Sequence, residues 1–205
     1  MAQSRPDNYA LQAERARQYF LSYDQAALIA KWNLDWDERY LYFDLFGRLY
    51  RICRVRGAFQ RKEKTHWVDG GFGEVMTGLD ILCDGDPSKP LTGRWKLMQN
   101  FGLLFHRNLM EPEKDSFAQA IQQDPNAFRR KCLALGGQSV PGGDMAFAIP
   151  VMGDLKILLQ FWFADEEFPP QVRYFWDENA LQYIRYETMH YALGYLKQML
   201  LEMKV

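Results

Sequence analysis

Glu187 and His190 are the residues whose types and spacing most readily suggest chemistry in this sequence. Three positions apart, their side chains share one face of a helix, where a carboxylate and an imidazole can form one pocket. Helical di-metal proteins use the same Glu-x-x-His spacing, but they need two copies and further carboxylates. Gly194, one turn beyond His190, leaves open space or lets another group approach the backbone. The structural alternative places Glu187 at the positive end of a helix and His190 beside its apolar stripe.

Five carboxylates lie close together in the segment FADEEFPPQVRYFWDENA, residues 163–180. Asp165-Glu166-Glu167 follows one predicted strand, and Asp177-Glu178 ends the next. A strand rises ~3.3 Å per residue, so the roughly ten residues between them span about 30 Å. We therefore expect two acidic turns in water rather than one five-carboxylate metal site. Asp177 stays a candidate third member of a catalytic pocket with Glu187 and His190.

Other chemical signatures are weak. The sequence contains no Gly-x-Ser-x-Gly nucleophile motif, and its glycine-rich stretch DGGFGEVMTG (69–78) matches neither the dinucleotide fingerprint nor the phosphate loop. Three cysteines, Cys53, Cys83 and Cys132, are far apart and form no Cys-x-x-Cys pair. This spacing argues against a disulfide framework, a zinc ribbon or an iron–sulfur motif within the chain. No metal site is predicted, and no cofactor is indicated.

Composition and charge exclude further classes of function. The chain has 205 residues, 48% of them hydrophobic, enough for a substantial core in a single domain. With 25 basic and 26 acidic residues the formal charge is −1, which gives no attraction to nucleic acid. No apolar run reaches the ~18–20 residues that span a bilayer. The N-terminus lacks an apolar signal core, so we expect a cytoplasmic protein.

Basic residues gather between positions 48 and 64. They follow the turn of a predicted hairpin and continue into a stretch expected to be a polar loop: Arg48, Arg51, Arg54, Arg56, Arg61, Lys62 and Lys64. One interpretation is a basic surface for an anionic ligand. A solvated strand face and loop is the favoured interpretation, because acids elsewhere balance the charge.

Periodicity predicts the elements that would position these residues. A helix is expected at 8–31, broken near Ser22, then a β-hairpin at 39–56 that turns near Gly47. A helical middle follows at 73–136. Its clearest signal is DPNAFRRKCLALGG, with Asp124 as the N-cap, proline at the first helical position and glycine at the end.

The C-terminal third predicts a meander of four strands, at 145–152, 155–163, 172–176 and 181–185. A final helix at 187–203 carries an apolar stripe that should pack on the sheet. The stripe consists of Met189, Leu193, Leu196, Leu200 and Met203. Because strands occur in adjacent antiparallel pairs, the sequence predicts one α+β domain over residues 1–205, an antiparallel sheet packed by several helices.

The same third resembles domain-of-unknown-function family 3786, found in largely anaerobic bacteria and archaea. The resemblance lies in Glu166-Glu167-Phe168-Pro169, Trp176-Asp177 and Tyr186-Glu187, with FDLFGRLYRI and PLTGRWKLM as earlier parts of the pattern. It implies an anaerobic context but no activity. Some members resemble fusions with an iron–sulfur domain; here the cysteines are dispersed, so a cluster would reside on a partner.

Two hypotheses on function follow. The first is a non-catalytic accessory or ligand-binding protein of anaerobic metabolism that docks a protein partner, such as an iron–sulfur or redox protein. The second is a metal- or carboxylate/His-dependent enzyme with a pocket near the start of the last helix, built from Glu187, His190 and Asp177. The two differ in whether these three side chains converge within ~6 Å, the range over which charges perturb one another.

Overall fold

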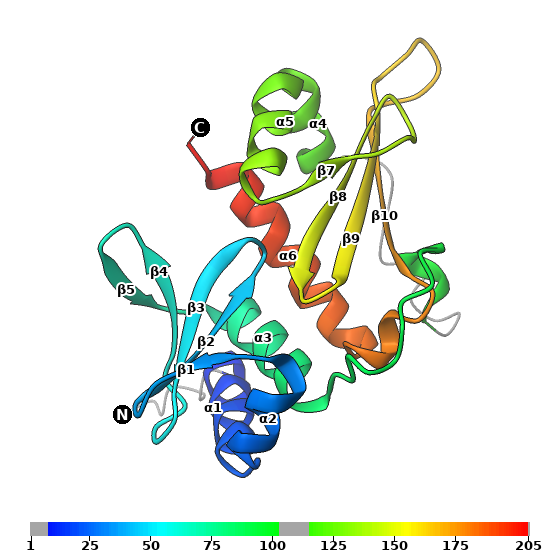
Figure 1. The fold of residues 1–205 in the computed structure, drawn as a ribbon. Coiled ribbons are helices and arrows are strands. Elements are labelled where there is room, and N and C mark those ends of the chain that lie inside the picture. Colours follow the sequence, from blue (N-terminus) through cyan, green and yellow to red (C-terminus); the bar gives the residue numbers. More distant parts are fainter. Residues whose placement is uncertain (1–7, 103–114, 205) are drawn as a thin grey trace, which may run out of the picture.

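The computed structural model describes residues 8–102 and 115–204 of the chain. Within these ranges the chain forms six α-helices and two antiparallel sheets of five strands each, so the predicted α+β class is confirmed. Figure 1 shows the last helix running between the two sheets. The helices are α1 (Asn8–Leu21), α2 (Gln25–Trp32), α3 (Phe72–Asp84), α4 (Ser116–Gln123), α5 (Pro125–Ala134) and α6 (Tyr186–Glu202).

The two sheets are called sheet A and sheet B. Sheet A follows the chain in the order β1-β2-β3-β4-β5, with β1 (Asp35–Trp36), β2 (Tyr40–Leu45), β3 (Arg48–Cys53), β4 (Phe59–Glu63) and β5 (His66–Asp69). Sheet B has the order β6-β10-β9-β8-β7, with β6 (Trp95–Leu97), β7 (Gln138–Ser139), β8 (Met145–Met152), β9 (Leu155–Trp162) and β10 (Gln171–Asp177).

The predicted N-terminal helix is broken where the sequence indicated. Its two parts are α1 and α2, and the break includes Ser22. Asp24 caps α2, because its carboxylate accepts hydrogen bonds from the first backbone N–H groups of the helix. The Ser22 hydroxyl donates to the Tyr19 carbonyl at the end of α1, at 2.6 Å.

The hairpin predicted at 39–56 is confirmed as β2 and β3. Gly47 forms its turn with φ at +66°, and a Cβ there would lie 2.4 Å from the Leu135 carbonyl oxygen, so both conformation and space require glycine. The prediction of a polar loop at 61–64 is wrong. Those residues belong to a second hairpin, β4–β5, with its turn at Lys64. Charged side chains on the inward face of β4 concealed its alternation.

Sheet B confirms the strands at 145–152 and 155–163 and the third strand as β10. The fourth predicted strand, 181–185, is wrong: Ala180–Gln182 is a 3₁₀ helix followed by a turn. The edge beside β10 is filled by β6, which pairs Leu97 with Phe175 and was expected to lie in the helical middle. Residues 103–114 of that predicted region lie outside the described residues.

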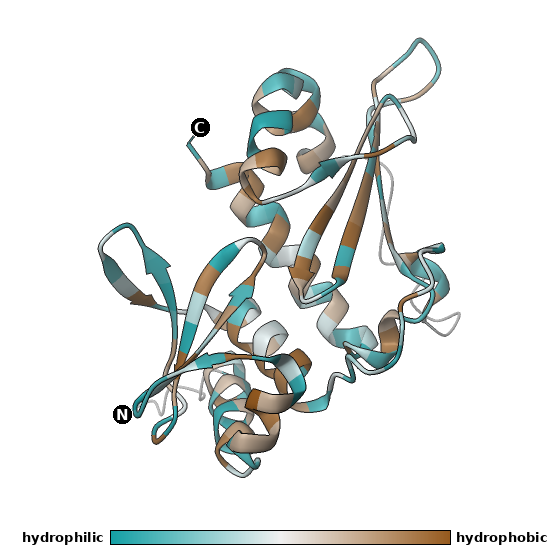
Figure 2. Cartoon of the chain, in the orientation of Figure 1, coloured by the Kyte–Doolittle hydropathy of each residue, from teal (hydrophilic) through white to brown (hydrophobic). Residues whose placement is uncertain are grey.

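The hydrophobic core includes buried side chains from both sheets in one cluster. Figure 2 shows brown, apolar segments along β8 and β9. Four members of the predicted α6 stripe are buried, and Met203 is partly buried. α6 contacts α3 and also α4 and α5, so it links the elements around sheet A to those around sheet B. Within the described ranges, no helix has the length and apolar character needed to span a bilayer.

Candidate functional site

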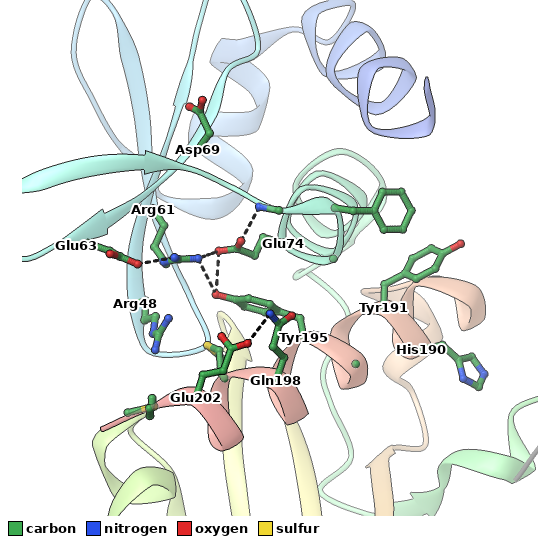
Figure 3. A pocket seen from close by; sticks show the side chains of 16 residues that line it. Arg48, Arg61, Glu63, Asp69, Glu74, His190, Tyr191, Tyr195, Gln198 and Glu202 are labelled. Atoms are coloured by element: carbon green, nitrogen blue, oxygen red, sulfur yellow. Dashed lines mark hydrogen bonds and ion pairs between the residues drawn. The ribbon is translucent and has the colours of Figure 1, made fainter. Parts of the chain in front are cut away.

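A cleft of about 670 Å³ opens between sheet A, the start of α3 and α6 (Figure 3). Its sheet wall is the inward face of β4, where Phe59, Arg61 and Glu63 alternate onto one side. Phe59 is buried under α3, and a Cβ on Gly78 would meet its ring at 2.5 Å. Beyond the cover of α3, the same face carries charge instead of apolar groups. Arg61 and Glu63 therefore line the cleft.

Glu74 is the centre of this site, and its side chain is almost fully buried (residue 3% exposed). Its Oε1 accepts hydrogen bonds from the hydroxyls of Tyr50 at 2.7 Å and Tyr195 at 2.8 Å, and forms an ion pair with Arg61. Its Oε2 accepts from the Gly71 N–H at 2.6 Å, which closes the N-terminus of α3. One carboxylate thus joins β3, β4, α3 and α6.

Arg61 lies between two carboxylates, with its side chain 17% exposed. It pairs with Glu74 and, at 2.5 Å, with Glu63. Burial would lower the pKa of Arg61, but hydrogen bonds to both carboxylates outweigh it and raise that pKa above its usual value. The hydrogen bond from Arg61 likewise lowers the pKa of Glu63. Arg61, Glu63, Glu74, Tyr50 and Tyr195 are called the Glu74 network below.

The two tyrosines of the network hold their protons tightly. Burial, reinforced by the Glu74 charge, raises the pKa of Tyr195 to about 12. Burial also raises the pKa of Tyr50 well above its ordinary value. The two hydroxyl oxygens lie 2.8 Å apart, beside the same carboxylate oxygen. Both therefore act at neutral pH as hydrogen-bond donors to Glu74.

These tyrosine pKa values predict a loss of stability at alkaline pH. Between about pH 10 and 12 the unfolded chain releases the Tyr195 proton while the folded chain keeps it, so the free energy of unfolding falls as pH rises. Below about pH 10 the contribution is fully present. Urea unfolding of Tyr195→Phe should show a shallower fall over this range than the unmodified chain, by up to ~1.4 kcal/mol per pH unit. Equal slopes would contradict the assignment.

The rest of the cleft is formed by a row of residues along one face of α6 and by the start of β3. Gly194, Gln198 and Glu202 follow one another at four-residue spacing, so they share one helix face. Glu202 accepts a hydrogen bond from Gln198 at 2.9 Å. Arg48 reaches in from β3 and lies on the opposite wall (Figure 3).

The three residues proposed as catalytic from the sequence are not brought together. Asp177 is buried (4% exposed) and accepts backbone hydrogen bonds from Thr92 at 3.1 Å and Gly93 at 2.7 Å. It holds the loop before β6 and lines neither the cleft nor a second cleft beside α1.

Glu187 is exposed, lines that second cleft of about 360 Å³ and accepts a hydrogen bond from Tyr191. His190 is also exposed and packs edge-to-face on Tyr186, with ring centroids 5.0 Å apart. It lines the larger cleft at one end, and Figure 3 shows its ring pointing away from the Arg61–Glu74 pair. Among the described residues there is no group of three or more His, Cys, Asp or Glu that could hold a metal ion.

The Glu74 network was missed by reasoning from the sequence, although two signals pointed to it. On β4, the sequence FQRKE places Phe59, Arg61 and Glu63 at alternate positions, so charge follows an apolar residue on the same face. Glu74 is the third residue of its helix after Gly71, the position at which glutamate closes a capping box. Reading residues 61–64 as a loop removed the first signal.

Comparison with known proteins supplies the family. No curated protein and no solved structure matches the chain. A family model described as a domain of unknown function, DUF3786, matches residues 24–199, which include α2 to most of α6 and therefore every residue of the Glu74 network. The chain belongs to the DUF3786 family.

Proposed function

We propose that this chain is a non-catalytic binding protein and that its ligand occupies the cleft between sheet A and α6. The observation that carries the proposal is Gly194, in the interior of α6, where glycine costs about 1 kcal/mol relative to alanine. A Cβ on Gly194 would meet nothing within 4 Å. By contrast, a Cβ on Gly73 of α3 would lie 3.2 Å from the Tyr195 Cβ. Packing explains Gly73 but not Gly194, whose bare backbone keeps the cleft open.

The volume of the cleft and the hydrogen-bonded network in its walls support the binding of a small molecule. Its volume of about 670 Å³ falls in the range of roughly 300–1,000 Å³ typical of small-molecule sites. The Glu74 network ties together its walls on β3, β4, α3 and α6 through buried hydrogen bonds. A fixed wall reduces the ordering cost that binding must overcome.

The protonation states of the network favour binding over catalysis. A general acid or base works best with a pKa near the working pH. Here the pKa values of Tyr50 and Tyr195 are raised and that of Glu63 is lowered, all away from neutrality. The enzyme alternative has less support, because Asp177 lies outside both clefts and Glu187 lines a different cleft from the Glu74 network.

The proposed setting is the cytoplasm of an anaerobe, where the protein serves as an accessory to an iron–sulfur or other redox protein. Its support is the family likeness together with the cysteines. Cys53, Cys83 and Cys132 are buried and free, and they lie on β3, α3 and α5. In this proposal any cluster belongs to the partner.

Replacing Gly194 by Leu tests the proposal by filling the cleft. Leucine is a good helix former, so the urea midpoint should stay the same or rise, by up to ~1 kcal/mol in unfolding free energy. The chain is incubated with a small-molecule extract of anaerobically grown cells, desalted and analysed by native mass spectrometry. We expect the unmodified chain to retain a compound that Gly194→Leu loses.

The matched control is Ala30→Leu, which adds a similar apolar side chain at an exposed position of α2, outside the cleft. It should retain the compound as the unmodified chain does. Retention by Gly194→Leu at the level of this control would place binding elsewhere. If the unmodified chain retains nothing from the extract, the proposed function is wrong.

A further inference from the structure

We infer that the ligand of the cleft is a small zwitterion that carries a carboxylate and an ammonium group, as a free α-amino acid does. The inference rests on the proposed function and names the chemistry of its ligand. Its basis is a pair of opposite charges, Arg48 and Glu202, that line the cleft from opposite walls without meeting. They form no ion pair within 4.0 Å.

Arg48 is the cation that the carboxylate of the ligand would use. It is the first residue of β3 after the turn at Gly47, and its side chain is on the same inward face as Tyr50. It is partly buried, and within residues 8–102 and 115–204 its guanidinium makes no hydrogen bond or ion pair. A guanidinium presents a planar fork of donors that fits a carboxylate with two parallel hydrogen bonds.

Arg61 cannot take this role, although it lines the same cleft. Its charge is already shared by Glu63 and Glu74. An anion there would have to displace a buried carboxylate from its guanidinium. In the part of the chain that the structure describes, Arg48 has no such competitor at contact distance; its charge makes only a minor contribution to the lowered pKa of Glu63.

Glu202 is the anion that the ammonium group would use. It lies two turns beyond Gly194 on the same face of α6, and its Oε1 accepts the hydrogen bond from Gln198. Its Oε2 has no hydrogen-bond partner among the described residues. An ammonium group carries three donors and can therefore bond this oxygen.

The charges of the two walls explain why a ligand with one charge fits less well. A simple anion at Arg48 would also meet the carboxylates of Glu63 and Glu202. A simple cation at Glu202 would meet the unpaired charge of Arg48. A zwitterion satisfies both walls at once, and its uncharged part can lie over the open backbone at Gly194. The cleft is also lined by apolar and aromatic side chains, from Phe72, Tyr191, Met199 and Met203, and by the polar side chains of Asp69, His190 and Gln198.

The test uses the proteinogenic amino acids as probes. Each is titrated into the ¹⁵N-labelled chain while the Gly194 amide resonance is followed. For the amino acid that binds best, two blocked forms are then compared: its carboxamide, which keeps only the ammonium, and its N-acetyl derivative, which keeps only the carboxylate. We expect the free amino acid to shift the Gly194 resonance and each blocked form to bind at least about tenfold more weakly, as loss of one charged contact implies.

Two charge-removing variants make the test specific. Arg48→Gln should weaken binding of the free amino acid about tenfold without weakening binding of the carboxamide. Glu202→Gln should likewise weaken binding of the free amino acid about tenfold without weakening binding of the N-acetyl form. Neither side chain has an ion pair with another described residue, so both variants should keep the urea midpoint of the unmodified chain.

The inference is overturned if a blocked form binds as tightly as the free amino acid, or if no amino acid moves the Gly194 resonance. Neither result removes the proposed function, which the cell extract and Gly194→Leu decide separately. If the unmodified chain retains nothing from the extract and an amino acid binds tightly outside the cleft, both are overturned.

Discussion

Replacing Glu74 by Gln is expected to lower the free energy of unfolding by about 3–5 kcal/mol, because Arg61 loses its buried partner and keeps only the half-exposed Glu63. Glutamine keeps the shape and one acceptor oxygen. It removes the charge that pairs with Arg61, and its amide N–H₂ group would face the donor N–H of Gly71. Domains of this kind have total stabilities of about 5–15 kcal/mol. The variant should therefore show a greatly lowered urea midpoint.

The control for this prediction is Glu63→Gln. Glu63 pairs with the same arginine, but its side chain is 45% exposed, so water can replace what the variant loses. Its effect should stay below about 1 kcal/mol. The comparison thus separates burial from mere pairing with Arg61. If both variants lower the free energy of unfolding only slightly, the Glu74 carboxylate does not hold the walls of the cleft together.

A second variant tests the physical reason. Adding Arg61→Met to Glu74→Gln removes the cation that has lost its buried partner and should recover part of the loss seen in Glu74→Gln. The glutamine oxygen can still accept from the Tyr50 and Tyr195 hydroxyls. Recovery is expected because a buried charge that has lost its buried partner costs more than an apolar side chain of similar volume. A double variant that is less stable than Glu74→Gln would contradict this explanation.

Local signals in the sequence predicted those elements whose determinants are themselves local. For α5, Asp124 accepts the capping hydrogen bond from the Ala127 N–H at 2.8 Å, and Pro125 occupies the first turn. The β8–β9 hairpin was predicted from two apolar strands, 145–152 and 155–163, separated by two residues that include Gly153, whose φ is +55°. In these cases the residues that define the element are neighbours in the chain.

The errors occur where a distant segment decides the structure. β6 pairs with β10 although some eighty residues separate them, as in Leu97 opposite Phe175. Once β6 fills that edge, residues 181–185 have no strand to join and pack Tyr183 and Ile184 into the core. No periodicity in a short window contains this information.

The site could be predicted only in part, for the same reason. The open space expected at Gly194 is present, since a Cβ there would meet nothing within 4 Å. The Glu74 network, however, joins Tyr50, Glu74 and Tyr195, residues that only the approach of β3, α3 and α6 brings together. The spacing of Glu187 and His190 suggested a pocket, yet the two side chains line different clefts.

Asp177→Ala is expected to cost about 3 kcal/mol of stability, since hydrogen bonds to a charged acceptor are worth about 1.5–3 kcal/mol each and their donors would be left unpaired. The carboxylate accepts from the backbone N–H groups of Thr92, Gly93 and Asn179, at 2.7–3.1 Å. It thereby fixes the loop that brings β6 to the edge of β10. The measurements are urea unfolding and amide hydrogen exchange of Thr92 and Gly93, which should become faster.

The neighbouring acid gives the control. Glu178 pairs with Arg94, whose side chain is 74% exposed, and its own backbone N–H bond to the Arg94 carbonyl survives truncation. Glu178→Ala should leave the urea midpoint within experimental error. The comparison also decides what Asp177 is for. A catalytic carboxylate is commonly held at some cost to stability, so its removal leaves a protein as stable or more stable. If Asp177→Ala unfolds at the same or a higher urea concentration, the structural role is wrong and the enzyme hypothesis regains its third residue.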